Sequence, residues 1–242
     1  MGSDKVLLSC KNLDIRYDGV VRAVRGISIE VNEGEFVSII GSNGAGKSTT
    51  LKAISGINKL YDGEIWFDGK RIDGMAPYNI IKLGLTHTPE GRLIFPFLSV
   101  RDNLLMGAYI RKDNTAVEQD IEKMFDRWPI LRQKEKQMGG ELSGGQQMIL
   151  AIARSLMTRP KMLLMDAPSQ GLAPLVIKEV ASVLSELNRE GLAVLLVDQN
   201  ARLCLRLAQR AYLFEVGQVV MTGTGAEMSA SERVQKSYLG VV

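Results

Sequence analysis

The segment Gly41-Ser42-Asn43-Gly44-Ala45-Gly46-Lys47-Ser48 constrains the fold of this chain more than any other. It fits the pattern G-x-x-x-x-G-K-[ST], follows the strand-like run Glu35–Ile40 and precedes Thr49–Ile54, where apolar residues recur at helical spacing. Glycines let several backbone N–H groups face one anion, and the helix N-terminus adds partial positive charge. The sequence therefore predicts a phosphate-binding loop between a strand and a helix, the alternative being a glycine turn that precedes Lys-Ser by chance.

Two side chains of this loop predict a metal-nucleotide site. Lys47 is expected to reach the β and γ phosphates of a nucleotide, and the Ser48 hydroxyl to ligate Mg²⁺. The buried run Met162–Met165 ends in Asp166, which we expect at the carboxyl end of a strand beside the strand 35–40. A carboxylate there can hold Mg²⁺ opposite Ser48. An Asp after an apolar strand is also typical of a helix cap, so the prediction depends on both motifs together.

A second candidate anion site follows Leu142. Ser143-Gly144-Gly145-Gln146 opens an expected helix that runs to Met157, and it offers a hydroxyl and two glycine amides at a helix N-terminus. The alternative is a simple N-cap in which Ser143 and Gln146 form a capping box. One chain with two phosphate-recognition surfaces suggests that two copies enclose the nucleotide between them.

The rest of the chain alternates between strand and helix patterns. The turn signals Asp18-Gly19 and Asn32-Glu33-Gly34 predict antiparallel strands from Leu7 that end in the strand 35–40. Buried strands alternating with helices in the second half predict a parallel sheet. The other expected elements are a strand at 64–67, helices at 100–131 and 143–157, strands at 161–166 and 193–198, helices at 175–190 and 201–208, a hairpin at 212–222 and a short C-terminal helix.

Composition excludes several classes of function. The 30 Lys and Arg are scattered among 27 Asp and Glu, giving a net charge of +3, so nucleic acid is not an expected partner. Cys10 and Cys204 lack the spacing of a disulfide framework or metal site. No apolar run approaches the roughly 20 residues of a membrane-spanning helix, and Gly2–Lys5 shows no signal-peptide core, which predicts a cytoplasmic chain. The one histidine, His87, has no neighbouring base or ligand cluster, which favours a structural role.

The phosphate loop, Leu142–Gln146 and the strand ending at Asp166 occur in the order seen in one family. In these motifs the chain resembles the nucleotide-binding subunits of ATP-binding-cassette (ABC) transporters. The resemblance implies an α/β P-loop NTPase fold with a mainly parallel core sheet, an antiparallel β subdomain and an inserted helical subdomain. It implies a single ABC ATPase domain over residues 1–242, with 1–89 and 158–242 as the nucleotide-binding core and 90–157 as the helical subdomain.

Finer features resemble one branch, the ATPase subunits of bacterial branched-chain amino-acid importers, and particularly the second of their two ATPase subunits. Importers of urea or short amides share much of this pattern. The resemblance implies ATP and Mg²⁺ as ligands, a dimer with itself or a paralogue, and transmembrane permease subunits through which the chain meets the inner face of the cell membrane. The segments that carry it are Pro89–Arg92, Leu104–Ala108, Gly171–Pro174, Gln199–Ala201 and Tyr238–Gly240.

The same resemblance assigns roles to individual residues. Tyr17 matches the aromatic residue that stacks on adenine, although a tyrosine in a hairpin or core is the alternative. Glu90 stands where most of the family has a Gln that senses Mg²⁺ and the attacking water, and the nearby surface is expected to contact the membrane partner. Gln199 replaces a His that contacts the γ phosphate. The phosphate loop with Thr49, and Ser143–Gln146 of the other copy, are expected to hold the phosphates.

Ala167 departs from the family pattern. The family and this branch place a Glu directly after the strand-ending Asp, where it polarises the attacking water. Loss of a general base costs on the order of 10² to 10⁴ in rate, so we expect impaired hydrolysis with ATP binding retained. Gln170 also departs from the branch, which has Leu there. Two other readings stay open: a nucleotide-binding module without hydrolysis, such as the degenerate half of a heterodimer, and a soluble ABC protein of translation or DNA repair.

Overall fold

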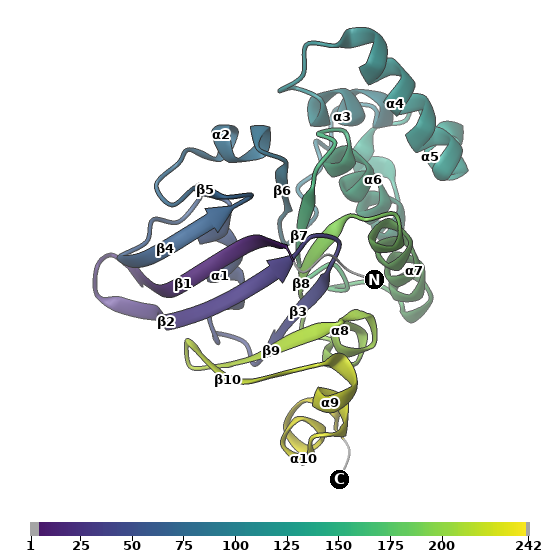
Figure 1. Cartoon of the computed structure of the whole chain (residues 1–242). Coiled ribbons are helices and arrows are strands. Elements are labelled where there is room, and N and C mark those ends of the chain that lie inside the picture. The colour runs from purple at the N-terminus through teal and green to yellow at the C-terminus, as the bar shows by residue number, and fades with distance from the viewer. Residues whose placement is uncertain (1–4, 241–242) are drawn as a thin grey trace.

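The computed structural model describes residues 5–240 and contains two sheets (Figure 1). The first is antiparallel, in the order β2-β1-β4-β5, and is made of β1 (Val6–Tyr17), β2 (Val21–Asn32), β4 (Asp62–Phe67) and β5 (Lys70–Arg71). The second has the order β10-β9-β3-β8-β7-β6 and is parallel except for the pairing of β10 with β9. Its strands are β3 (Phe36–Gly41), β6 (Leu85–Thr88), β7 (Met162–Asp166), β8 (Ala193–Val197), β9 (Arg210–Glu215) and β10 (Gln218–Gly223).

Two strand placements differ from the sequence predictions. The strand 35–40 does not extend the antiparallel set, because β3 lies in the second sheet and pairs in parallel with β8 and β9. All six of its residues are buried, which is typical of a central strand covered on both faces. The strand that ends in Asp166 does not lie beside β3 either, since β8 separates them. Both β7 and β8 are fully buried five-residue strands, so their burial pattern does not determine their order.

The helix expected from Val100 to Leu131 is three helices. Asp113 precedes the second of them, and Pro129 starts the third because Trp128, the residue before a proline, leaves the helical region. These helices and α6 stand together at one side of the second sheet (Figure 1). They are α3 (Val100–Gly107), α4 (Asn114–Arg127), α5 (Pro129–Gln133) and α6 (Gly144–Leu156), with a 3₁₀ turn, η1, at Gly139–Glu141.

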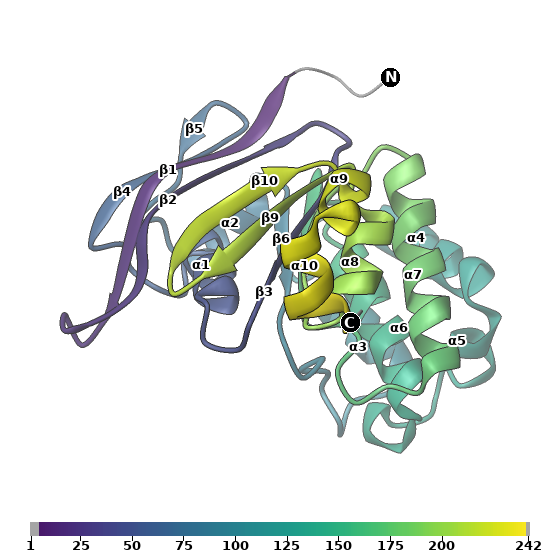
Figure 2. The same ribbon diagram turned by 90° about the horizontal axis from the view of Figure 1, so that it is seen from below.

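The remaining helices complete the fold around the second sheet. They are α1 (Lys47–Ile54), α2 (Pro77–Lys82), α7 (Pro174–Arg189), α8 (Ala201–Leu207), α9 (Gly225–Ala230), α10 (Glu232–Val234) and the π-helical turn η2 (Gln235–Leu239). Seen from below, the C-terminal helices lie against α8 (Figure 2). Over residues 5–240, no helix has the length and apolar character needed to span a membrane.

Strand β3 separates two hydrophobic cores. Val37 and Ile39 pack with α1 and the antiparallel sheet, whereas Phe36 and Ile40 pack with the cluster beneath α6, α7 and α8. This alternation follows the two-residue period of a strand that is buried on both faces. The packing fixes the carboxyl end of β3, and with it the glycine loop, between the two halves of the molecule.

Candidate functional site

The loop between β3 and α1 curls around its own lysine. Nζ of Lys47 donates hydrogen bonds to the carbonyls of Gly41 and Ser42, both at 2.8 Å. Gly46 has a φ of +98°, and a Cβ there would lie 2.7 Å from the Ala23 carbonyl. Burial lowers the pKa of Lys47, although the carboxylate of Asp166 acts in the opposite direction. The loop thus holds a buried cation at the start of a helix, which is the arrangement that binds phosphate.

Ser48 and Asp166 meet although 118 residues separate them in the chain. The Ser48 hydroxyl donates to Oδ1 of Asp166 at 2.8 Å, while Oδ2 is buried and has no hydrogen-bond partner in the described part of the chain. Burial raises the pKa of Asp166, and the bond from Ser48 partly offsets this. An unpartnered buried acceptor beside a hydroxyl is the oxygen donor set that Mg²⁺ takes. These two residues therefore fit the metal.

A cavity of about 660 Å³ opens above this pair and gathers most of the residues predicted for the site. Its lining residues come from β1 and β2, from the phosphate loop and the start of α1, from the carboxyl ends of β7 and β8 and the segments that follow them, and from the turn between β9 and β10. The predicted residues that line it are Tyr17, Asn43, Gly44, Ala45, Gly46, Lys47, Ser48, Thr49, Glu90, Asp166 and Gln199. Gly41 and Ser42 form the base of the loop behind Lys47.

Tyr17 stands at the edge of this cavity, at the end of β1. The residue is 44% exposed, and its hydroxyl lies 2.9 Å from Oγ1 of Thr49 in α1. The contact ties the tyrosine to the helix that follows the phosphate loop. An exposed ring held in this way offers a flat apolar surface to a base whose phosphates occupy the loop.

Ser143, Gly144, Gly145 and Gln146 lie outside the cavity of their own chain. Ser143 caps α6, and Gln146 completes a capping box in which each side chain accepts from the other's backbone N–H. Packing adds a reason for the glycines that the sequence did not reveal. A Cβ on Gly145 would lie 2.6 Å from Val176 of α7, and one on Gly144 would lie 3.2 Å from the guanidinium of Arg92.

Ala167 follows Asp166 in a conformation unusual for a residue with a side chain. Its φ is +48°, it is 8% exposed, and its N–H donates to the carbonyl of Val197 at 2.7 Å. A non-glycine residue in the left-handed region persists only where its surroundings hold it there, and such positions cluster at functional sites. Ala167 and Gln170 both line the cavity.

The structure adds contacts to the site that sequence reasoning missed. The turn between β9 and β10 braces the phosphate loop, because the N–H of Gly217 donates to the Ala45 carbonyl at 3.1 Å. Arg25 of β2 in turn donates its N–H to the Gly217 carbonyl at 2.8 Å, and Val216 lines the cavity. The only sequence signal was a hairpin glycine, which predicts a turn but not its partner.

His87 lies outside the nucleotide cavity, on β6. Its Nδ1 is 3.0 Å from the Ser55 hydroxyl, and Nε2 is buried with no partner among the described residues. Burial lowers the pKa of His87 to about 4, so the ring is neutral at physiological pH. The geometry is that of a packed histidine between β6 and α1.

Comparisons with known proteins identify the family of the chain. The family model for ABC transporters matches residues 24–170. The branched-chain amino-acid transport ATP-binding protein BraG of Pseudomonas aeruginosa is 42% identical over 225 residues, which cover 93% of this chain and 96% of BraG. The lipopolysaccharide export protein LptB of Escherichia coli is 34% identical over 235 residues, covering 96% and 97% of the two chains.

Solved structures show the same fold. The ADP conformation of MJ1267, an ATP-binding cassette of an ABC transporter, superposes with a TM-score of 0.84 at 28% identity and covers 97% of this chain and 99% of that one. The dimeric MJ0796 cassette gives a TM-score of 0.79 at 25% identity, covering 90% and 98%. The α/β P-loop NTPase fold and the resemblance predicted from the sequence are both confirmed. The chain therefore belongs to the ABC transporter family, as an ATP-binding subunit.

Proposed function

We propose that the chain binds Mg-ATP at a head-to-tail dimer interface and powers branched-chain amino-acid import through separate membrane subunits. The observation that carries this proposal is the single cavity in which the phosphate loop, the Ser48–Asp166 pair, Glu90 and Gln199 come together. The similarity to BraG over nearly the whole chain supports the solute class. The chain then acts at the inner face of the cell membrane, held there by its partners.

Each group at the cavity has a role in this proposal. Lys47 binds the β and γ phosphates, and Gln199 donates a hydrogen bond to a γ-phosphate oxygen. Ser48, Asp166 and Glu90 hold Mg²⁺, which when bound neutralises charge on the phosphates. Tyr17 stacks on the adenine. Because Ala167 offers no carboxylate to polarise water, hydrolysis is slow relative to an ATPase with Glu at that position.

A second ATPase subunit completes the site. Ser143–Gln146 do not reach the cavity of their own chain, and Ser143 is exposed at the N-terminus of α6. A second copy or a paralogue in head-to-tail orientation brings this N-terminus to the γ phosphate. The MJ0796 cassette, described as dimeric, supports such an arrangement.

The permease subunits are proposed to contact the surface beside Glu90. A groove of about 380 Å³, lined by His87 and Leu93 on either side of Glu90 in the chain, lies between the core and the helical subdomain. Its exposed apolar side chains suit a protein partner better than water, since exposed apolar patches mark interaction sites. They include Tyr78, Leu93, Phe95, Met106 and Tyr109.

One alternative function is supported by the residue at position 167. Ala167 suits a nucleotide-binding module that does not hydrolyse ATP, such as the degenerate half of a heterodimer. The name of LptB states that LptB takes part in lipopolysaccharide export. Export of such a solute by this chain has weaker support than amino-acid import, because the chain is 34% identical to LptB and 42% identical to BraG.

Lys47→Ala is expected to weaken ATP binding about 10- to 100-fold, because a charge-assisted hydrogen bond to phosphate contributes about 1.5–3 kcal/mol. Fluorescence titration with a labelled ATP measures this, and light scattering with phosphate release follows dimer formation and hydrolysis. Lys59→Ala, an exposed lysine after α1, is the matched control. Equal ATP affinity in both variants would argue against the phosphate loop as the nucleotide site.

Mg²⁺ is expected to increase the ATP affinity of Asp166→Asn by a factor about tenfold or more smaller than in the parent chain. The substitution removes a charged ligand of the metal while keeping the side-chain shape. The measurement is the same titration across a Mg²⁺ series and in EDTA. Binding in EDTA should persist, since Lys47 and the loop amides are unchanged. An unaltered Mg²⁺ response would place the metal elsewhere.

A further inference from the structure

We propose that the side-chain amide of Gln170 orients the attacking water in this chain, next to the position where Ala167 offers no carboxylate, an assignment that rests on the proposed function. Gln170 and Ala167 line the same cavity as Lys47 and Asp166. The N–H of Gln170 donates to the Ala167 carbonyl at 3.1 Å, so the chain turns back and brings residue 170 close to residue 167.

The backbone before Gln170 is anchored. The Ser169 hydroxyl donates to Oδ1 of Asp198 at 2.6 Å, and the Ser169 N–H donates to Oδ2 at 2.8 Å. Asp198 is buried at the end of β8, so this pair holds the turn against the core sheet. The Gln170 side chain itself is exposed and has no hydrogen bond to any residue between 5 and 240. An anchored backbone with a free amide suits a group that binds water and phosphate only when nucleotide is present.

None of the carboxylates that line the cavity is available to hold the attacking water beside Ala167. Among the described residues they are Glu90, Asp166 and Asp198. Asp166 accepts from Ser48 and fits the metal. Asp198 accepts three hydrogen bonds, two from Ser169 and one from the N–H of Asn200 at 2.8 Å. Glu90 follows β6, the edge strand beyond β7, and is assigned to Mg²⁺. The position beside Ala167 is therefore left to Gln170.

An amide can do part of the work of a carboxylate. Its carbonyl accepts a hydrogen bond from water and its NH₂ donates to a phosphate oxygen, so one side chain can align both reactants. Glutamine has this water-positioning role in GTPases. It takes up no proton, so Gln170 is a positioning group and not a base.

The step balances without a base. The water oxygen forms a bond to the γ phosphorus as the bond from that phosphorus to the bridging oxygen breaks, and ADP leaves with the electron pair. A proton of the water passes to a γ-phosphate oxygen, which gives dihydrogen phosphate. Gln170 begins and ends neutral, holding the water in line with the breaking bond.

The test is a double-mutant cycle on single-turnover phosphate release from Mg-ATP. Gln170→Leu in the parent chain should slow release on the order of tenfold to 10²-fold, because the alignment of water is lost. ATP affinity should fall by less than the rate does, because Lys47 and the loop amides still hold the phosphates. The same change combined with Ala167→Glu should alter the rate by less than about twofold, since the carboxylate then holds the water. By light scattering at saturating ATP, the ATP-bound dimer of Gln170→Leu should last longer than that of the parent chain, in proportion to its slower phosphate release.

Gln133→Leu, an exposed glutamine of α5, is the matched control and should leave release unchanged. The proposal is overturned if Gln170→Leu releases phosphate at the parental rate, if it slows both backgrounds equally, or if the parent binds ATP but releases none in a turnover. A parent that lacks Lys47-dependent ATP binding would instead overturn the proposed function, and the binding titration detects this before any rate is compared.

Discussion

Ala167→Glu is expected to raise the rate of ATP hydrolysis by about 10²- to 10⁴-fold, the range that a positioned general base contributes. Position 167 directly follows Asp166 and lines the cavity, so a carboxylate there points at the space above the phosphate loop. Its backbone is already in the left-handed region, at a φ of +48°, so Glu adds no strain that Ala does not carry. ATP affinity should change little, because Lys47 and Ser48 are untouched.

Steady-state and single-turnover phosphate release measure this gain. Ala167→Gln is the matched control, because it fills the same volume without a base and should recover only a small part of the rate. The ATP-bound dimer should also become shorter-lived, since faster hydrolysis converts it to the ADP form. A rate that stays at the parental level in Ala167→Glu, with ATP binding intact, would mean that position 167 does not limit hydrolysis.

The meeting of Ser48 and Asp166 could be predicted from the sequence. Asp166 ends one buried apolar strand and Ser48 follows another, and carboxyl ends of parallel strands meet at one edge of a sheet. The prediction survived an error in strand order, because β8 between β3 and β7 does not move either residue from that edge. The local sequence predicts which segments are buried strands and at which edge of the sheet they end. It does not predict the order of equally buried strands, because their packing decides that order.

Other features of the site depend on contacts that no local pattern encodes. The glycines after Ser143 look like an anion site, yet Gly145 also has to be small because Val176 packs against it. The hydrogen bond from Gly217 to Ala45 joins a hairpin turn to a loop more than 170 residues earlier in the chain. Such pairs become visible only once both sheets are assembled.

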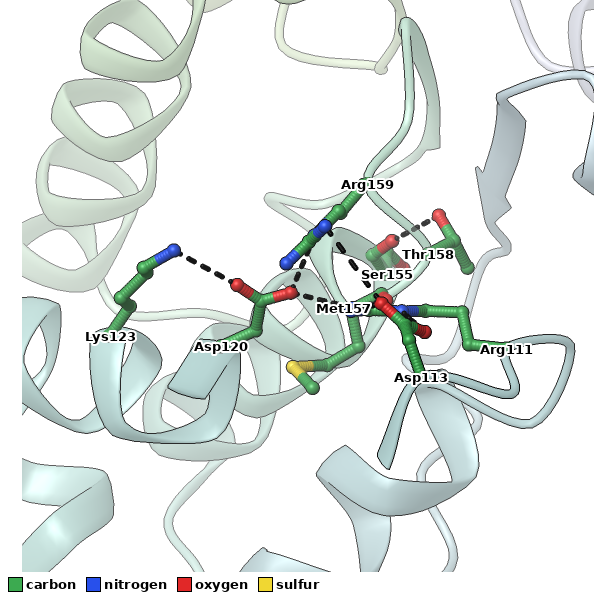
Figure 3. A network of polar contacts seen from close by, with 8 residues as sticks. All are labelled: Arg111, Asp113, Asp120, Lys123, Ser155, Met157, Thr158 and Arg159. Atoms are coloured by element: carbon green, nitrogen blue, oxygen red, sulfur yellow. Dashed lines mark hydrogen bonds and ion pairs between the residues drawn. The ribbon is translucent and has the colours of Figure 1, made fainter. Parts of the chain in front are cut away.

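An ionic cluster around Asp120 is expected to contribute strongly to stability (Figure 3). Asp120 of α4 is 6% exposed, and its Oδ2 accepts from Arg111 and from Arg159, both at 2.6 Å. Oδ1 accepts from Lys123 at 3.1 Å. Arg111 also donates to the Met157 carbonyl at 3.0 Å, so the cluster ties α4 to the end of α6.

Asp120→Ala is expected to lower the free energy of unfolding by about 3 kcal/mol, because removing one partner of a buried ion pair leaves the other charge unpaired. The Arg111 side chain, only 9% exposed, then keeps only the half-exposed carboxylate of Asp113 and the Met157 carbonyl as partners among residues 5–240. Urea denaturation measures the change. Asp126→Ala in the same helix is the matched control: its carboxylate is 76% exposed, and its pair with Arg132 should contribute no more than about 1 kcal/mol. Because both changes add an alanine to α4, helix propensity cancels in the comparison.

The pH dependence of this difference identifies the charge as its cause. Burial alone raises the pKa of Asp120, but hydrogen bonds from Arg159, Arg111 and Lys123 outweigh it and hold that pKa well below its usual range. A carboxylate whose pKa is lower in the folded state stabilises the fold above its unfolded pKa, about 3.9, and loses that contribution as the pH falls toward the folded value.

The gap in unfolding free energy between the parent chain and Asp120→Ala should therefore be constant from pH 7 to about pH 5 and shrink below about pH 4. The same pH series on Asp126→Ala, whose carboxylate is exposed, is the control. A gap that keeps its full size at low pH would mean that Asp120 stabilises the helical subdomain by packing and not by charge. In that case the link between α4 and the end of α6 would rest on the apolar contacts of the subdomain alone.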